Sequence, residues 1–250
     1  MVKAMRHSIF TAALALTLAF GSSANAATGP SGAWAQWTAG NDVSNIASLQ
    51  RGAANFMGYC AGCHSIKYMR YSRMSADLKI PEEQLESKLL LPGSKRSDYI
   101  TTALSPADGE AWFGKAPPDL SLITRAKGTD YVYQFLKTFY ADPKSTNGTN
   151  NLALPGTAMP HVLSSLQGVQ TAKFSEGEHP HWESFELVEP GQLSPEAYDE
   201  FVRDTVNFLE YVGEPAKAKR QSLGVWVILF LLVFTGFAYL LKKEYWKDVK

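Results

Sequence analysis

Cysteine is scarce in this chain, since its 250 residues contain only Cys60 and Cys63. A structural zinc site usually takes four ligands, and the chain has no second pair of cysteines to complete one. The sequence also has no internal repeat, no low-complexity tract and few runs in which polar and apolar residues alternate. It therefore predicts a mostly α-helical protein with long loops rich in glycine and proline.

The two cysteines lie three positions apart and are followed at once by His64. Cys-x-x-Cys-His is the attachment pattern of a c-type haem. Two thiols at this spacing reach the vinyl groups at one edge of a porphyrin, and the next residue turns its imidazole onto the iron. A thioredoxin-like pair needs no adjacent histidine and expects a βαβ setting, which the sequence lacks; an ordinary disulfide is the other alternative. The motif predicts one covalent haem on Cys60 and Cys63, with His64 as an iron ligand.

The N-terminus has the pattern of a secretory signal peptide. A positively charged start precedes a short apolar segment at residues 9–20, and a small-x-small cleavage site follows at 24–26. We expect residues 1–26 to be removed, with an uncleaved anchor as the alternative. Export suits the haem motif, because bacterial c-type cytochromes receive their haem on the periplasmic side.

Residues 223–241 form a second apolar segment, 19 residues long and without charge. As a helix rising about 1.5 Å per residue it spans roughly 28 Å, close to the hydrocarbon thickness of a bilayer. Tryptophan and tyrosine lie near its ends, where interfacial aromatic residues are typical. The segment predicts a single transmembrane helix.

Basic residues flank this span on both sides, so their bias only weakly favours a cytoplasmic C-terminus. The signal peptide and the haem motif decide the orientation. We expect a cytochrome c-like haem domain at 27–213 in the periplasm, a linker at 214–222 and a cytoplasmic tail at 242–250. The expected location is the inner membrane of a Gram-negative-type bacterium.

Three helices are predicted in the haem domain. Residues Asn45–Tyr59 place apolar side chains on one stripe and lead directly into the cysteine motif. Residues Asp130–Tyr140 carry aromatic residues four apart. The last helix begins with Ser194 as N-cap and Pro195 at the first helical position, and residues 213–215 interrupt it before the membrane span.

The charge balance is uneven along the chain. Residues 27–213 contain 15 basic and 21 acidic residues, a net charge of −6, although the whole chain is neutral. Between Glu176 and Asp204 there are nine acidic residues, and Arg203 is the only base. This acidic segment is either a docking surface for a positively charged partner or a solvated loop.

The second axial position of the iron has to be filled from elsewhere in the chain. Met57 and Met69 lie too near the cysteine motif to reach the opposite face of the ring easily. Met159 lies in a loop at 154–160 that contains proline and glycine, and such a loop can hold a thioether against iron. Methionine ligation raises the reduction potential and closes the iron to substrates, which favours an electron carrier. His161 is the local alternative to Met159.

Two further features belong to the predicted pocket. The stiff turn Pro117–Ser121 offers carbonyl groups, such as that of Pro118, that can accept the imidazole N–H of His64 and fix its orientation. The alternative is a plain helix start capped by Asp119 or Ser121. Arg125 is either a partner for a haem propionate or an ordinary surface arginine.

Taken together, the motifs resemble the bacterial form of the cytochrome c1 family, the haem subunit of the ubiquinol–cytochrome c oxidoreductase, or bc1 complex. The resemblance covers nearly all of the chain after the signal peptide. The cysteine motif is general to c-type cytochromes, and the combination of motifs is specific to the family. The matching segments are Gly58–Ser65, Pro117–Ser121 with Arg125, Pro155–Pro160 with Met159, and a lone C-terminal anchor that ends in Tyr245–Lys250.

The resemblance implies that Cys60 and Cys63 hold the haem, that His64 and Met159 ligate its iron, and that Arg125 faces a propionate. It implies electron relay from a Rieske iron-sulfur protein to a cytochrome c, beside cytochrome b in a lipid membrane, with no substrate chemistry of its own and no nucleic acid. The acidic segment departs from the family because it is not one dense run.

Three other functions stay open. The chain could be another membrane-anchored monohaem cytochrome, such as one that serves a terminal oxidase. It could be a haem enzyme or sensor with an open distal site, or a structural membrane protein with a disulfide.

Overall fold

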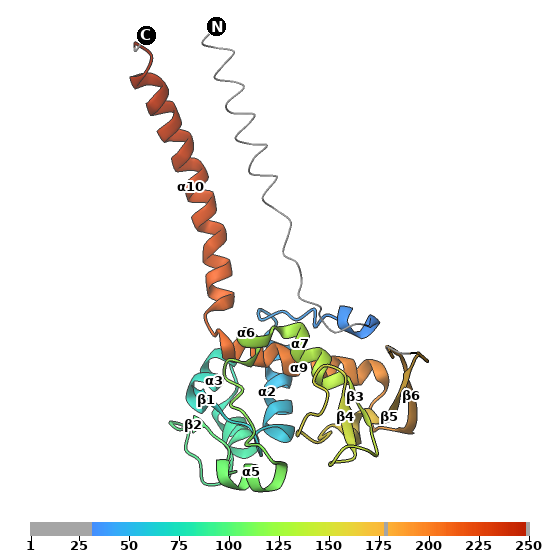
Figure 1. Cartoon of the computed structure of the whole chain (residues 1–250). Coiled ribbons are helices and arrows are strands. Elements are labelled where there is room, and N and C mark those ends of the chain that lie inside the picture. Colours follow the sequence, from blue (N-terminus) through green and yellow to red (C-terminus); the bar gives the residue numbers. More distant parts are fainter. Residues whose placement is uncertain (1–31, 178–179, 249–250) are drawn as a thin grey trace. The chain divides into compact units, whose positions relative to one another are not determined.

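The computed structural model describes residues 32–177 and 180–248 (Figure 1). The expected signal peptide at 1–26 and the last two residues of the expected tail lie outside the described residues. Most of the regular structure is helical, which confirms the predicted fold class. The helices are α2 Ile46–Tyr59, α3 Tyr71–Leu78, α4 Glu82–Gln84, α5 Pro106–Phe113, α6 Ile123–Lys127, α7 Thr129–Lys137, α8 Ser164–Gln167, α9 Pro195–Gly213 and α10 Lys217–Tyr245, with a 3-10 turn at Ala33–Gln36 and a π-helical turn at Leu85–Leu89.

The described strands form three separate two-stranded antiparallel sheets. They pair β1 with β2, β3 with β4 and β5 with β6. The sequence did not predict the longest of these sheets, the β5–β6 hairpin. The strands are β1 Ile66–Arg70, β2 Tyr99–Ile100, β3 Phe139–Ala141, β4 Thr149–Asn151, β5 Gly168–Phe174 and β6 Trp182–Pro190.

The predicted first and last helices of the haem domain are confirmed as α2 and α9. The side chain of Asn45 accepts a hydrogen bond from the Ser48 amide at the start of α2. Ser194 caps α9 by accepting from the amide of Ala197, and Pro195 is its first residue. Each cap satisfies a backbone donor that the first helical turn leaves free.

These two helices pack closely against each other (Figure 1). Phe56 of α2 and Phe208 of α9 are both fully buried, and their ring centroids lie 5.8 Å apart. At Gly52 the approach is closest, since a Cβ atom there would lie 2.0 Å from the carbonyl oxygen of Asp204. Glycine is therefore required at this position of α2.

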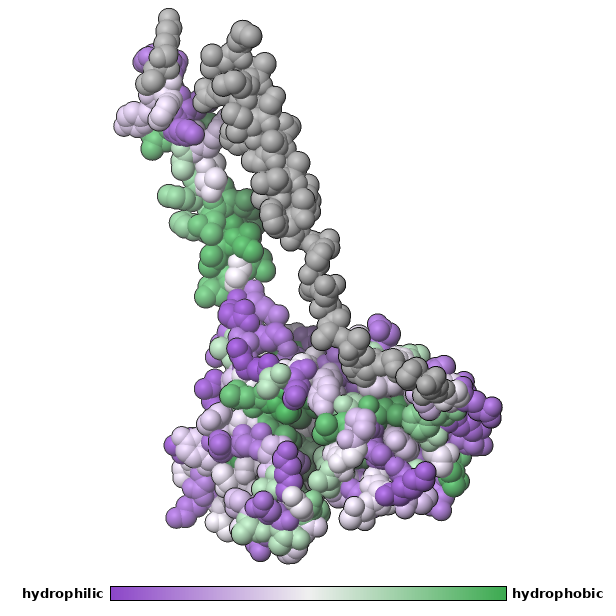
Figure 2. Space-filling model, viewed as in Figure 1, coloured by the Kyte–Doolittle hydropathy of each residue, from purple (hydrophilic) through white to green (hydrophobic). Residues whose placement is uncertain are grey.

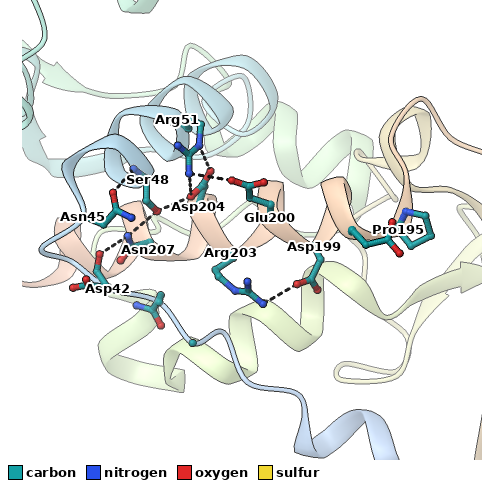
Figure 3. Close-up of a pocket in the computed structure, with 13 residues that line it drawn as sticks. Asp42, Asn45, Ser48, Arg51, Pro195, Asp199, Glu200, Arg203, Asp204 and Asn207 are labelled. Atoms are coloured by element: carbon teal, nitrogen blue, oxygen red, sulfur yellow. Dashed lines mark hydrogen bonds and ion pairs between the residues drawn. The ribbon is translucent and has the colours of Figure 1, made fainter.

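A polar pocket of about 610 Å³ opens beside the α2–α9 contact (Figure 3). Its central ion pair joins Arg51 Nε to Asp204 Oδ2 at 2.5 Å, and Asp204 is only 4% exposed. Ser48 Oγ also donates to Asp204, at 2.6 Å, and Asn207 donates to Ser48 Oγ at 2.9 Å. The network ties the start of α2 to the middle of α9.

The helix expected at Asp130–Tyr140 is shorter than predicted. α7 ends at Lys137, and Thr138 leaves the helical conformation with φ −105° and ψ 20°. Phe139 then begins β3, where it is buried and faces Asn151 of β4 across the sheet. The aromatic spacing that predicted helix therefore spans a helix end and a strand, because Phe139 packs from β3 instead.

α10 contains the whole predicted membrane span. It is the one helix in the described part of the chain that is long and apolar enough to cross a membrane, and none of its residues is buried. α9 and α10 are separated at Glu214, where φ is −152°. α10 begins at Lys217, so most of the segment expected as a linker at 214–222 is helical.

Candidate haem-attachment site

The Cys-x-x-Cys-His motif forms a tight turn at the end of α2. The Cys60 amide donates to the Phe56 carbonyl at 2.8 Å, which continues the helical pattern by one residue. The amides of Cys63 and His64 then both donate to the Cys60 carbonyl, at 3.1 and 2.8 Å. The turn fixes both thiols and the imidazole on one short segment, anchored by the buried Phe56.

Both cysteines are free thiols and half-buried. Burial, together with the nearby Cys63, raises the pKa of the Cys60 thiol to about 12. The Cys60 side chain is therefore neutral at physiological pH, because its pKa lies far above 7. Neutral, half-buried thiols suit contact with the apolar edge of a porphyrin.

His64 is oriented by a hydrogen bond to the Pro117–Ser121 turn. Its Nδ1 atom lies 2.7 Å from the carbonyl oxygen of Pro118. A carbonyl can only accept, so Nδ1 carries the proton and Nε2 presents its lone pair. Burial lowers the pKa of His64, although the Pro118 carbonyl and Asp119 oppose this effect, so the imidazole is neutral and able to bind a metal.

Further hydrogen bonds connect the same turn to the segment after His64. Asp119 accepts from the amide of Ser121 at 2.9 Å with one carboxylate oxygen and from the amide of Lys67 at 2.9 Å with the other. The Leu120 amide donates to the carbonyl of Ser65 at 2.8 Å. Asp119 thus fixes the position of the Pro118 carbonyl relative to the cysteine motif.

The alternative reading of this turn as a capped helix start is wrong. α6 begins only at Ile123, and the N-cap position is Leu122, which makes no side-chain capping bond. An aspartate that binds the amide two residues ahead of it forms an Asx turn, and that pattern is visible in the sequence. The second bond, from the Lys67 amide to Asp119, joins distant segments and has no sequence signal.

Arg125 lies on α6 and is 57% exposed at its side chain. Its guanidinium donates to Glu214 at 3.2 Å, and Glu214 also pairs with Arg220 at 2.8 Å. The structure therefore places Arg125 beside the α9–α10 junction, where it forms an ion pair with Glu214. A contact between Arg125 and a haem propionate stays a prediction.

Met159 is half-buried in an irregular loop. Pro155 and Gly156 are the central residues of a turn in this loop. The Thr157 amide closes the turn by donating to the Leu154 carbonyl at 3.1 Å. Gly156 has φ +73°, a value that suits glycine at the third position of a type II turn. Helix hydrogen bonds do not constrain Met159, because among the described residues its amide donates to Thr157 Oγ1 alone, at 3.4 Å.

His161, the local alternative to Met159, stacks on Phe139 with ring centroids 5.0 Å apart and planes 4° from parallel. Burial lowers the pKa of His161 to about 4, so the imidazole is neutral. Among the described residues neither ring nitrogen has a hydrogen-bond partner. Both properties are compatible with a packed side chain and with an iron ligand.

The remaining methionines near the motif are less available. Met69 and Met74 are fully buried in the hydrophobic core, and the hydroxyl of Tyr211 lies 3.9 Å from the sulfur of Met69. Met57 packs against the same core from α2. In residues 32–177 and 180–248 no group of three or more His, Cys, Asp or Glu side chains could hold a metal ion.

The residues present fit a c-type haem. Two cysteine thiols, a neutral imidazole with a free Nε2 lone pair and a thioether on a separate loop form the donor set such a haem takes. Figure 2 shows hydrophobic side chains gathered around a hollow in the face viewed, near α2 in Figure 1. A hydrophobic face near α2, the helix that leads into the attachment turn, suits a porphyrin ring.

The acidic segment divides into two parts with different surroundings. On α9 the carboxylates are largely paired within the protein, Asp204 with Arg51 and Asp199 with Arg203 at 2.8 Å. On β6 the carboxylates are exposed, and Glu186 pairs with Lys173 at 2.9 Å on the surface. The exposed carboxylates of β6, Glu183, Glu186 and Glu189, therefore offer a partner a group of negative charges on one strand.

The fold and the site define a single-span membrane protein of the c-type cytochrome class. Residues 92–249 match the family model described as the Cytochrome C1 family, a range that includes Met159 but begins after the cysteine motif. The chain is 50% identical to "Cytochrome c1" of Allochromatium vinosum, over 83% of this chain and 87% of the relative. The chain therefore belongs to the cytochrome c1 family, and this membership implies a haem cofactor.

Two further relatives carry other names. The "Ammonia monooxygenase gamma subunit" of Nitrosomonas europaea is 42% identical, over 83% of this chain and 86% of that protein. The "Cytochrome b/c1" of Bradyrhizobium diazoefficiens is 27% identical, and 80% of this chain matches 33% of that longer protein.

Proposed function

We propose that this chain is the electron-transfer subunit of a bc1-type quinol–cytochrome c oxidoreductase. It accepts one electron from a Rieske iron-sulfur protein and passes it to a cytochrome c. Cys60 and Cys63 would hold one haem covalently, and His64 and Met159 would ligate its iron. A haem bound in this way supplies one-electron chemistry by cycling between ferric and ferrous iron.

The observation that carries this proposal is the hydrogen bond from His64 Nδ1 to the Pro118 carbonyl, at 2.7 Å. It fixes the tautomer that leaves Nε2 free, and it does so inside a haem-attachment motif. Met159, on its own loop, would supply the second ligand to the iron and so exclude water and small ligands. A chain with both positions filled relays electrons and does not bind substrate at the metal.

The proposed partners follow from family membership and from the membrane anchor. One relative is named for cytochrome b and cytochrome c1 together, which supports cytochrome b as a neighbour. α10 anchors the chain in the bilayer, and the proposed orientation puts the haem domain in the periplasm. Quinol oxidation is then the task of cytochrome b and the Rieske protein, and this chain makes and breaks no substrate bonds.

The experiment that tests the proposal is a redox-titrated optical spectrum of the membrane-extracted protein, before and after carbon monoxide. A c-type spectrum with a high potential and no response to carbon monoxide is the expected result. A low potential with ready carbon monoxide binding would instead mean an open iron and an enzyme or sensor. Loss of haem-stained protein in the Cys60→Ala/Cys63→Ala variant tests the covalent link separately.

Affinity purification of the tagged full chain tests the partners. Recovery of cytochrome b and a Rieske protein is expected. Recovery of terminal-oxidase subunits, or of a monooxygenase such as the name of one relative suggests, would contradict the bc1 assignment. Replacing Met159 by Leu and His161 by Phe, one at a time, identifies the sixth ligand, because only loss of the true ligand opens the iron to carbon monoxide.

A further inference from the structure

Three asparagines of the β3–β4 ribbon contact the loop that carries Met159. They are Asn147, Asn150 and Asn151, here called the asparagine clamp. The sequence offered no reason to connect them with the haem site. Their side chains bind the backbone of residues 153–158, the stretch of irregular chain that immediately precedes Met159.

Asn151 is the centre of the clamp and is fully buried. Its Oδ1 atom accepts from the amides of Ala153 at 2.9 Å and Leu154 at 3.1 Å, and from Thr138 Oγ1 at 3.2 Å. Its Nδ2 atom donates to the Phe135 carbonyl at 2.7 Å. A single side chain thereby joins α7, the end of β4 and the first residues of the loop.

The other two members hold the loop closer to Met159. Asn150 Oδ1 accepts from the Gly156 amide at 2.8 Å, and its Nδ2 donates to Asp142 at 2.9 Å. Asn147 Nδ2 lies 3.4 Å from the carbonyl oxygen of Ala158, the residue directly before Met159. The clamp therefore forms hydrogen bonds with the backbone of the type II turn and of the residues on either side of it.

The far end of the loop returns to the same ribbon. Phe139 of β3 is the cross-strand partner of Asn151, and its ring stacks on His161, two residues after Met159. Phe139 and Asn151, which face each other across the β3–β4 ribbon, thus contact the two ends of the loop. Ordering an irregular loop of this length costs conformational entropy, and side-chain bonds to its amides offset that cost before any ligand binds.

We propose that the asparagine clamp is a positioning device that holds Met159 for axial ligation and so keeps the iron closed. This inference rests on the proposed function. Asn150 and Asn151 act through the backbone and do not touch the iron themselves. The clamp sets the equilibrium between a closed loop, with the thioether in place, and an open loop that admits exogenous ligands.

The test compares Asn150→Ala and Asn151→Ala with Asn207→Ala in the full-length holoprotein. Asn207 is also fully buried and hydrogen-bonded, but it lies on α9 and bonds to Ser48 and Asp42. All three variants are expected to lower Tm. Only the two clamp variants should weaken the far-red absorption band of methionine-ligated ferric haem, lower the reduction potential and raise the carbon monoxide-bound fraction about tenfold for each lost hydrogen bond.

A clamp variant that loses stability while keeping the wild-type band, potential and carbon monoxide response would overturn the inference. So would an Asn207→Ala variant with the same spectral changes, because the effect would then follow general loosening. If Asn151→Ala does not accumulate, the partly exposed Asn150→Ala decides alone. Failure of the proposed function looks different, because wild type itself would then lack covalent haem or the methionine band.

Discussion

The Nδ1 atom of His64 donates a hydrogen bond to the carbonyl oxygen of Pro118, 54 residues further along the chain, at 2.7 Å. The bond joins the end of α2 to the Pro117–Ser121 turn, so the two motifs form one site. A backbone acceptor cannot be removed by substituting its own side chain. The relationship is therefore tested through Asp119, whose carboxylate holds the acceptor in place.

Asp119→Ala should lower the free energy of unfolding by about 1–3 kcal/mol, because the amides of Lys67 and Ser121 lose their acceptor. It should also raise the reduction potential. When the Pro118 carbonyl is held less firmly, its hydrogen bond with Nδ1–H weakens. The imidazole then carries less negative charge, so His64 donates less electron density to the iron. Thermal unfolding and a redox titration of the holoprotein measure the two effects.

Asp98→Ala is the matched control for this variant. Asp98 is an exposed carboxylate that accepts from the Lys95 amide at 2.7 Å in a turn outside the site. A small loss of stability with an unchanged potential is expected. Equal shifts of potential in both variants would mean that Asp119 does not act through His64.

Gly52→Ala should prevent α2 and α9 from packing as they do, since the new Cβ would lie 2.0 Å from the Asp204 carbonyl oxygen. In an isolated helix the same change stabilises by about 1 kcal/mol. Here the new Cβ would clash with a backbone oxygen of α9, which cannot rotate away as a side chain can. We therefore expect a net destabilisation of at least about 2 kcal/mol. Urea unfolding followed by circular dichroism measures it.

Gly58→Ala on the same helix provides the comparison. A Cβ atom at Gly58 meets no protein atom within 4 Å, so this variant should be neutral or slightly stabilising. If Gly52→Ala were as stable as Gly58→Ala, the close contact between α2 and α9 would be wrong.

The elements that could be predicted from sequence are those with a local signal. Asn45 and Ser194 are caps that satisfy amides three residues ahead, and the apolar stripe of α2 needs only helical periodicity. The membrane span is a matter of length and composition. The Cys-x-x-Cys-His turn is likewise a single short segment.

The parts that were missed depend on distant segments. Phe139 continues the aromatic spacing of α7, but its pairing with Asn151 in a β ribbon decides its conformation. The β5–β6 hairpin has no clean alternation because β6 is exposed on nearly every residue. The bonds from Lys67 to Asp119 and from Asn151 to Phe135 likewise exist only once the chain has folded.

Glu183→Gln with Glu186→Gln should slow electron transfer to a basic cytochrome c and flatten its dependence on ionic strength. Both residues lie on β6, where the carboxylates are exposed. Exposed charges steer a partner over roughly a Debye length, and salt screens that effect. Stopped-flow rates at several salt concentrations measure it.

Glu82→Gln with Glu83→Gln is the control, because these residues are also exposed but lie on α4. This pair should leave the rate and its salt dependence nearly unchanged. Equal slowing in both double variants would point to net charge, and no slowing in either would leave β6 as a solvated strand.

Asp199 should make the stability of the domain depend on pH. Burial opposes its ionisation, but Lys137, Tyr133 and Arg203 outweigh burial and lower the pKa of Asp199 below 3.8. A carboxylate with a lowered folded-state pKa stabilises the fold fully above its unfolded pKa, and that contribution is lost as pH falls through the folded pKa. Asp199→Asn should therefore cost about 1–2 kcal/mol near pH 7, and this cost should shrink as the pH falls below the ordinary carboxyl pKa of about 3.9.

Urea unfolding of wild type and Asp199→Asn across this pH range measures the difference directly. Glu200→Gln is the matched control, since Glu200 is the next residue along α9 and its side chain is 66% exposed. The gap between wild type and Asp199→Asn should close as the pH falls, while the gap for Glu200→Gln should stay small throughout. A gap for Asp199→Asn that is constant with pH would mean that Lys137 and Arg203 do not stabilise the ionised carboxylate, and that Asp199 contributes only through packing.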